Sequence, residues 1–197
     1  MRDNLESFWN FKIKGVIGAF LLIFSRLIEI VNTKIISFFI KRNFASFGSN
    51  VMIEKGFKYR NPLKIKIGSN VNIGKNVVFT SEIKSGYIII EDNVNIGRNC
   101  KIDFSGGVII KENTLLSEGV IIQSHDHGLN PKSKPIGCEL IIHKNVWIGL
   151  EAMILYSAKH IGENAILGAR ALLTKPINEK EIFAGIPAKK IKTRIDL

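Results

Sequence analysis

The chain has 197 residues, a length that suits one domain with a short appendage. A hydrophobic content of 46% excludes a largely disordered polypeptide. The two cysteines, Cys100 and Cys138, do not suggest a disulfide framework, so a reducing compartment such as the cytoplasm is expected. The formal net charge of +11 indicates an anionic partner. No nucleic-acid recognition motif accompanies that charge, which argues against a nucleic-acid-binding function.

Residues 1–45 predict an amphipathic N-terminal helix. Apolar side chains recur there every three or four residues: Ile13, Ile17, Phe20, Phe24, Leu27, Val31, Ile35 and Phe38. The longest apolar run, 15–24, is shorter than the roughly 20 residues of a membrane span. Two interpretations stay open. The helix packs on the rest of the protein or on a neighbouring subunit, or it lies on the inner surface of the cytoplasmic membrane.

Residues 46–178 carry a six-residue repeat. One aliphatic or aromatic position recurs in groups of three: Phe47, Ile53, Tyr59; Ile67, Ile73, Phe79; Ile90, Ile96, Ile102; Ile110, Leu116, Ile122; Ile142, Ile148, Ile154; and Ile161, Leu167, Leu173. A period of six fits neither an α-helix nor a single strand and indicates a solenoid. Three six-residue sides make one triangular coil, so the spacing predicts about six coils with extra residues inserted at a single corner.

Two further columns accompany the repeat. Small or β-branched residues form a second apolar column: Val51, Val71, Val77, Val94, Cys100, Val120, Val146, Ala152, Ala165 and Ala171. Asparagine, which tolerates left-handed backbone angles at tight turns, is frequent between the two columns. The pattern predicts an all-β solenoid, a parallel β-helix whose interior these two apolar columns fill.

With this repeat pattern the chain resembles the hexapeptide-repeat acyltransferases. The resemblance is densest in NVWIG (145–149), IGENAILGA (161–169), LLTK (172–175) and AGIPAKKIK (184–192). It implies a left-handed parallel β-helix, assembly as a homotrimer, and transfer of an acetyl group from acetyl-CoA without a metal. Within this family the chain is most similar to the maltose- and galactoside-type enzymes and to the polysaccharide O-acetyltransferases.

The long loop 124–139 is the expected place for chemistry. A loop of this length on a rigid scaffold is commonly functional, and His125 and His127 stand at its entrance. A histidine titrates near neutrality and can take the proton of an acceptor hydroxyl. No cysteine or serine stands near a base at a useful spacing, which favours direct transfer over a covalent acyl-enzyme.

The resemblance assigns roles around this loop. The segment 127–131 aligns with the family segment that holds the catalytic histidine, which makes His127 the expected base. The segment 124–128 resembles the paired-histidine signal of enzymes that act on surface polysaccharides, so His125 is expected to line the acceptor pocket or hold the loop. Asp103, one coil earlier at the same corner, and Asp126 are expected to bind the acceptor. His143 and His160 are expected to be structural or solvated.

The donor side is also implied by the resemblance. In the family, coenzyme A lies in the groove between two β-helices, beside the last coils. The matching positions are Trp147, Gly149, Leu150, Ala169, Thr174, Lys175, Lys189 and Lys192. Trp147 is expected on an outward column. The basic tail 179–197 would place Lys189 and Lys192 near the 3′-phosphate of coenzyme A.

The preferred interpretation is an acetyl-CoA-dependent O-acetyltransferase for a sugar hydroxyl in surface polysaccharide biosynthesis. Two alternatives from other classes stay open. One is a zinc carbonic anhydrase of the β-helix type, with His125, His127 and His143 as metal ligands. The other is a β-helix that serves only as an assembly scaffold. Zinc content, bicarbonate turnover and coenzyme A binding distinguish the three.

Overall fold

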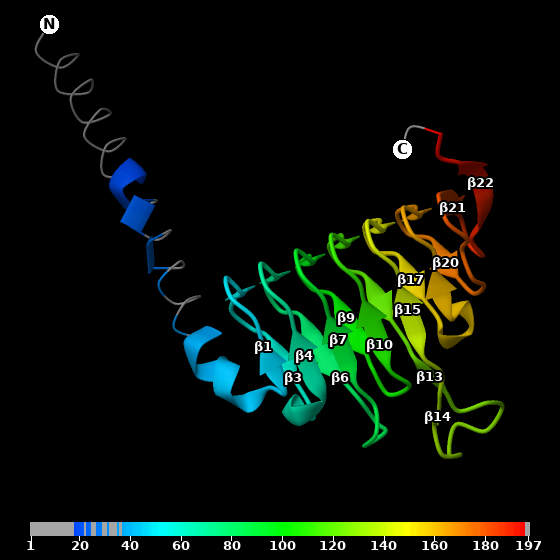
Figure 1. The fold of residues 1–197 in the computed structure, drawn as a ribbon, viewed down its shortest axis with the longest axis horizontal. Helices are drawn as coiled ribbons and strands as arrows, with labels where there is room; N and C mark the ends of the chain where they lie inside the picture. The colour runs from blue at the N-terminus through cyan, green and yellow to red at the C-terminus, as the bar shows by residue number, and fades with distance from the viewer. Residues whose placement is uncertain are drawn as a thin grey trace, which may run out of the picture.

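The computed structural model describes residues 18–21, 23–24, 27–28, 31, 35 and 37–195, and it shows an all-β parallel solenoid (Figure 1). Three stacked sheets form its sides. Sheet A contains β1 (Ser46–Phe47), β4 (Ile65–Ile67), β7 (Ile88–Ile90), β10 (Val108–Ile110), β15 (Leu140–Ile142) and β18 (His160–Ile161). Sheet C contains β3 (Lys58–Tyr59), β6 (Val78–Thr80), β9 (Lys101–Asp103), β12 (Ile121–Ile122), β17 (Met153–Ile154) and β20 (Leu172–Leu173).

Sheet B closes the triangle and continues past the other two sheets. It contains β2 (Met52–Ile53), β5 (Asn72–Ile73), β8 (Asn95–Ile96), β11 (Leu115–Leu116), β16 (Trp147–Ile148), β19 (Ile166–Leu167), β21 (Glu181–Ala184) and β22 (Lys189–Thr193). The structure has about seven turns where the spacing predicts about six coils. The reason is that Ile177 bridges Ile161 and β21 pairs with β19, which begins a further turn that the six-residue spacing does not mark.

The predicted interior columns are confirmed. The aliphatic positions from Ile53 to Leu173 are buried, and Phe47 and Tyr59 at the first turn are partly buried. The second column, from Val51 to Ala171, is also buried and includes Cys100. Because a strand alternates its side chains, the outward residues of the same strands are at least partly exposed, except Asp103 at the end of β9, which is buried. The core therefore runs as one continuous apolar cluster along the solenoid axis.

Two of the three corners are uniform. The connections from sheet A to sheet B (48–51, 68–71, 91–94, 111–114, 143–146, 162–165) and from sheet B to sheet C (54–57, 74–77, 97–100, 117–120, 149–152, 168–171) all have four residues. The predicted asparagines at these corners adopt positive φ, for example Asn76 at 59° and Asn99 at 58°. Their amides stack from turn to turn, and the Asn76 Nδ2 donates to the Asn99 Oδ1 at 3.2 Å.

The third corner, between sheet C and sheet A, holds all of the insertions, as the spacing predicts. It contains the 3-10 helix η2 (Pro62–Lys64), the segments 81–87 and 104–107, the long segment 123–139, and η3 (Tyr156–Ala158). The long segment forms a hairpin of β13 (His125–Asp126) and β14 (Ile136–Gly137), which projects beyond the other turns (Figure 1). We call this edge the insertion corner.

The C-terminal segment is not a free tail. Strand β22 returns antiparallel along β21 and ends sheet B, with Lys190 Nζ 2.7 Å from the Glu181 carboxylate. That hydrogen bond is the main cause that lowers the pKa of Glu181. Lys189 and Lys192 are exposed on this strand. The basic tail is therefore an ordered strand at the last turn of the solenoid.

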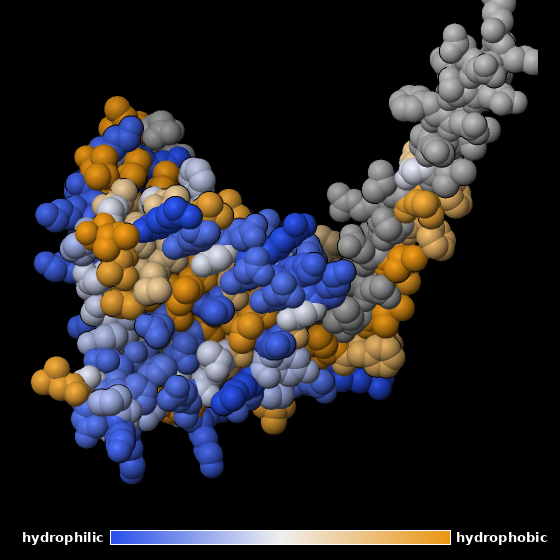
Figure 2. Space-filling view, turned by 180° about the vertical axis from the view of Figure 1, so that it is seen from behind, coloured by the Kyte–Doolittle hydropathy of each residue, from blue (hydrophilic) through white to orange (hydrophobic). Residues whose placement is uncertain are grey.

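The described residues from 18 to 40 have helical backbone and lead into η1 (Lys41–Asn43). Apart from Ile40, which is partly buried against the core, the large apolar side chains described there are exposed, among them Phe20 at 66% and Phe38 at 66%, and Figure 2 shows these exposed side chains as an apolar strip beside a largely hydrophilic solenoid face. Within this single chain they do not pack on the solenoid. Ile13 and Ile17 lie outside the described residues. In the part of the chain that the structure describes, the helices are too short or too polar to cross a membrane.

Candidate functional site

The insertion corner brings together side chains from three successive insertions. Glu82 comes from the segment after β6, Asp103 and Ser105 from the end of β9, and the two histidines from β13 and the residue after it. Because parallel coils stack these insertions, residues separated by 20 or more positions in the sequence become neighbours. Three of the residues in this group, Asp103, His125 and His127, are predicted from the sequence, and the structure places the two histidine rings 5.2 Å apart between centroids.

His125 is held by a buried carboxylate. Its Nδ1 lies 2.7 Å from the Asp103 Oδ1, and the two side chains are only 10% and 9% exposed. An ionised carboxylate only accepts hydrogen bonds, so Nδ1 carries the proton and the lone pair is left on Nε2. Asp103 thus orients His125. The contacts of Asp103 are with protein groups, and its role at the acceptor stays a prediction.

Asp103 is itself fixed by two serines, one at its carboxylate and one at its backbone carbonyl. Ser105 donates from its hydroxyl to Oδ2 at 2.9 Å and from its backbone N–H to Oδ1 at 3.2 Å. The Ser124 hydroxyl donates to the Asp103 carbonyl oxygen at 2.9 Å, and the Gly106 N–H donates to the same hydroxyl oxygen at 2.9 Å. A buried polar network of this kind is stable only when its members are satisfied, and a satisfied network fixes one orientation of the histidine.

His127 is held by its own loop. The Nδ1 of His127 lies 2.8 Å from the Ser133 carbonyl oxygen, and the Ser133 hydroxyl donates to the His127 carbonyl oxygen at 2.6 Å. A carbonyl oxygen only accepts, so Nδ1 is again the donor and Nε2 is the basic nitrogen. The His127 side chain is 30% exposed, against 10% for His125. His127 is the more accessible of the two bases.

Glu82 faces both basic nitrogens. Its Oε2 lies 3.4 Å from the His127 Nε2 and 3.9 Å from the His125 Nε2, and its side chain is 53% exposed. Sequence reasoning missed this residue. The sequence feature that could have indicated Glu82 is its position in the segment 81–87, which is inserted at the same corner as the histidines. That segment has no repeat position of its own, so the six-residue spacing does not mark the residue.

Asp126 points to a different partner. Its carboxylate accepts from the Tyr156 hydroxyl, which stands on η3 one turn further along the solenoid, and from the backbone N–H of His127 at 2.9 Å. The bond from Tyr156 is the main cause that lowers the pKa of Asp126, and the same bond raises the pKa of Tyr156. Asp126 therefore ties the hairpin to the following turn.

The base of the hairpin is closed by backbone and side-chain bonds. The Cys138 N–H donates to the Ser124 carbonyl oxygen at 2.8 Å. Where the chain returns to sheet A, the Tyr87 hydroxyl bonds to the Glu139 carboxylate, which raises the pKa of Tyr87 to about 12. These contacts fix the hairpin at both ends, so the histidines project from an anchored segment.

The predicted donor residues fall on separate parts of the chain. Thr174 and Lys175 follow β20 at the insertion corner, where the Thr174 carbonyl oxygen accepts from the Ser157 hydroxyl at 2.9 Å. Gly149, Leu150 and Ala169 lie at the corner between sheets B and C, with Leu150 45% exposed. Trp147 is outward on sheet B, as predicted, and is 49% exposed with its Nε1 donating to the Ser117 hydroxyl. In one chain, sheet C separates the two corner groups.

His143 does not join the loop histidines. It follows β15 at the uniform corner between sheets A and B, and His160 is the outward residue of β18 on sheet A. Burial and the nearby Lys111 lower the pKa of His143. Within this chain, the trio of His125, His127 and His143 proposed for a carbonic anhydrase is not assembled.

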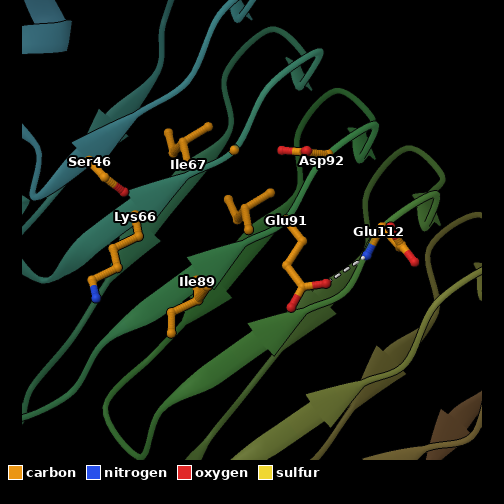
Figure 3. A pocket seen from close by; sticks show the side chains of 9 residues that line it. Ser46, Lys66, Ile67, Ile89, Glu91, Asp92 and Glu112 are labelled. Carbon is orange, nitrogen blue, oxygen red and sulfur yellow. Dashed lines mark hydrogen bonds between the residues drawn. The ribbon is translucent and has the colours of Figure 1, made fainter.

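A hollow of about 340 Å³ lies elsewhere, on the outer side of sheet A. Figure 3 shows that its lining side chains come from neighbouring turns, with a hydrogen bond of 3.2 Å from the Glu112 N–H to the Glu91 carboxylate. The hollow contains none of the histidines. We base the site on the clustered histidines, because they carry reactive nitrogens and fixed tautomers.

Comparison with known proteins agrees with this architecture. Residues 87–124 match the family model described as the hexapeptide repeat of succinyl-transferase. Over these turns the chain is similar to the hexapeptide-repeat acyltransferases. This stretch includes β7 to β12 and ends at Ser124, where the hairpin begins.

Two Escherichia coli proteins are similar over most of the chain. The galactoside O-acetyltransferase is 28% identical over 78% of this chain, and the match spans 66% of that relative, just under two thirds. The protein named as the lipopolysaccharide biosynthesis O-acetyl transferase WbbJ is also 28% identical, over 73% of this chain and 84% of its own length. Their names confirm the predicted resemblance to the galactoside and polysaccharide enzymes.

A solved structure shares the fold. The N-acyltransferase AntD from Bacillus cereus, in complex with dTDP and coenzyme A, aligns with a TM-score of 0.70 and 25% identity. The alignment covers 79% of this chain and 87% of that protein. The solenoid fold is thus shared with a protein that was solved in complex with coenzyme A.

Proposed function

We infer that the protein is an acetyl-CoA-dependent O-acetyltransferase whose acceptor is a sugar hydroxyl. The observation that carries this proposal is the pair of histidines at the insertion corner, each with Nδ1 held as a donor and Nε2 left as a base. The similarity to a galactoside O-acetyltransferase and to WbbJ supports the class of acceptor. WbbJ further supports a role in surface polysaccharide biosynthesis.

His127 is proposed as the general base. Its Nε2 takes the proton of the acceptor hydroxyl while the hydroxyl oxygen attacks the thioester carbonyl carbon. The carbon–sulfur bond then breaks, the acetyl ester forms, and the proton passes from His127 to the departing thiolate of coenzyme A. His127 suits this role because it is more exposed than His125 and its tautomer is fixed by the Ser133 carbonyl. His125 positions the acceptor beside it.

A sugar amine is the second candidate acceptor. The specific observation is the exposed carboxylate of Glu82, which faces both histidine Nε2 atoms and suits an amino group as well as a hydroxyl. AntD, named as an N-acyltransferase, shares the fold. An acceptor screen should therefore contain matched sugars with a hydroxyl or an amine at the same position.

For the donor, Thr174 and Lys175 are the proposed contacts nearest to the histidines. Because Gly149, Leu150, Ala169 and Trp147 lie across sheet C or on sheet B, we propose that coenzyme A is shared between two chains of a left-handed, trimeric assembly. The outward residues of sheet A support a contact between chains, since Ile89, Ile109 and Ile141 form a partly exposed apolar row on neighbouring strands. Lys189 and Lys192 on β22 are proposed contacts for the 3′-phosphate.

The N-terminal helix is proposed to rest on the cytoplasmic face of the membrane. Its described apolar side chains before Ile40 are exposed, and the exposed Lys41 and Arg42 follow the helix. An amphipathic helix beside basic residues is attracted to anionic lipid surfaces. This location would place the histidines near a lipid-linked sugar.

The deciding experiment is a calorimetric titration with acetyl-CoA, followed by a transfer assay on the sugar panel. We expect binding at one site per chain, weakened by Lys175→Ala and unchanged by the control Lys84→Ala in the insertion 81–87. We expect His127→Ala to lower turnover by about 10²-fold or more while leaving acetyl-CoA binding unchanged. Absence of acetyl-CoA binding would refute the proposed function, and full activity of His127→Ala would refute the assignment of the base.

A further inference from the structure

The Nε2 atoms of both loop histidines and a carboxylate oxygen of Glu82 converge on one small space. One ligand atom of each of these three residues lies within 4.8 Å of those of the other two. The Glu82 Oε2 is 3.4 Å from the His127 Nε2 and 3.9 Å from the His125 Nε2. Ligand atoms about 2.0–2.2 Å from a tetrahedral zinc ion stand about 3.4 Å apart, so one ion fits between them with a small adjustment of His125 and Glu82.

The second observation concerns the other nitrogen of each ring. A metal-bound histidine usually donates its second N–H to a carboxylate or to a backbone carbonyl, which fixes the tautomer and makes the ligand more basic. The Nδ1–H of His125 donates to the Asp103 carboxylate at 2.7 Å, and the Nδ1–H of His127 donates to the Ser133 carbonyl oxygen at 2.8 Å. Both rings are therefore already in the tautomer that presents Nε2 to an ion.

A metal ion can reach the space between Glu82 and the two histidines from solvent. The Glu82 side chain is 53% exposed, so the carboxylate can rotate and an ion can enter from solvent. Two imidazoles and one carboxylate suit zinc and neighbouring transition metals better than magnesium or calcium, which prefer oxygen ligands. We propose that Glu82, His125 and His127 of a single chain form a binding site for a divalent transition-metal ion of the zinc class.

The ion would act as an inhibitor and not as a requirement for acetyl transfer. A metal on the His127 Nε2 occupies the lone pair that is needed to take the acceptor proton. This consequence rests on the proposed function, whereas the binding site itself does not. Zinc should therefore lower turnover, and a chelator should restore it.

The test is a calorimetric titration of the full chain with zinc chloride after treatment with a chelator. We expect one ion per chain and at least a tenfold weaker affinity in Glu82→Gln and in His127→Gln. The matched controls are Glu179→Gln and His160→Gln, which change the same residue types away from the corner and should bind zinc as the parent does. Cobalt(II) should give the intense visible absorption of a four-coordinate ion in the parent and lose it in Glu82→Gln.

Two results would overturn the site: no stoichiometric zinc binding, or binding that Glu82→Gln and His127→Gln leave unchanged. Because Glu82 is exposed, its variant should keep the circular dichroism spectrum of the parent, so weaker binding cannot be assigned to unfolding. The two proposals also fail separately. A chain that binds zinc at these residues but does not bind acetyl-CoA would refute only the acetyltransferase, and a chain that transfers acetyl groups without binding zinc would refute only the metal site.

Discussion

The uniform corners and the insertion corner are built on the same stacked turns, but they differ in what fixes their conformation. At the uniform corners every turn repeats one solution, a residue with positive φ that is most often an asparagine, and several of these amides bond to the turn above or below. At the insertion corner each turn differs in length, and the conformation depends on specific contacts such as that of Asp103 with His125. The first arrangement stabilises the stack, and the second creates a site.

This difference teaches how a repetitive fold acquires chemistry. A solenoid in which every corner is uniform would present the same residues at each turn and hold no unique pocket. Confining the insertions to one edge leaves the core columns continuous and lets non-identical residues meet across turns. The predictions below change one type of corner or its core at a time.

The largest effect is expected for the core that both corner types share. Ile96→Ala removes a fully buried side chain from β8 and should lower the free energy of unfolding by about 2–5 kcal/mol. Its exposed neighbour Asn95 is the control, because Asn95→Ala should change stability by about 0.5 kcal/mol or less. Urea denaturation measures both. Equal losses would contradict the interior column.

The next largest effect is expected on turnover, when one carboxylate at each type of corner is replaced by an amide. Asp103→Asn replaces the carboxylate that holds the His125 Nδ1 proton by a neutral amide, whose NH2 group can face the ring instead, and it should slow acetyl transfer by about 10–100-fold. Asp92→Asn at a uniform corner removes a carboxylate that accepts from the Ser69 N–H at 2.7 Å, and it should leave turnover unchanged. Steady-state kinetics measures the turnover of both variants, and nitrogen NMR measures the tautomer of His125.

A purely structural role for Asp103 predicts a different outcome. In that case both variants would lose stability, the His125 tautomer would stay the same, and kcat would fall only in proportion to the folded fraction. The tautomer of His125 is therefore the deciding readout, since loss of packing alone does not move it.

The difference between the periodic turns and the unequal insertions also decides how much of the fold and of the site could be predicted from the sequence. The repeat is periodic, so the interior columns, the asparagine turns and the position of the insertion corner could be predicted from spacing alone. His125 and His127 could be predicted because they stand together at the start of the longest insertion. Their pairing with Asp103 was partly visible, since that residue lies at the same corner one turn earlier.

Other parts of the site could not be predicted because they depend on how unequal insertions stack. Glu82 reaches the histidines across two turns from a segment without a repeat position, and Ser133 meets His127 only because the hairpin folds back. Asp126 was expected at the acceptor, but its carboxylate bonds to Tyr156 on the next turn. The strand β22 was predicted as a tail, because its pairing partner β21 lies outside the six-residue spacing.

The smallest effect separates backbone strain from the amide ladder at a uniform corner. Asn76 has φ of 59°, so Asn76→Ala should cost about 1–2 kcal/mol from the left-handed backbone, to which loss of its amide bond to Asn99 adds. Asn76→Gly loses the same amide bond without the strain, and the difference in unfolding free energy between the two variants isolates the backbone cost.

Gly128→Ala gives the corresponding change in unfolding free energy for a residue with positive φ on the hairpin. Its φ is +66° and a methyl group there meets nothing within 4 Å, so only the backbone cost of about 1–2 kcal/mol is expected. If Asn76→Ala exceeds Gly128→Ala by the contribution of one hydrogen bond, about 0.5–1.5 kcal/mol, the ladder stabilises the uniform corners. Equal losses would mean that the asparagines are selected for their backbone conformation alone, and that the interior columns hold the stack together.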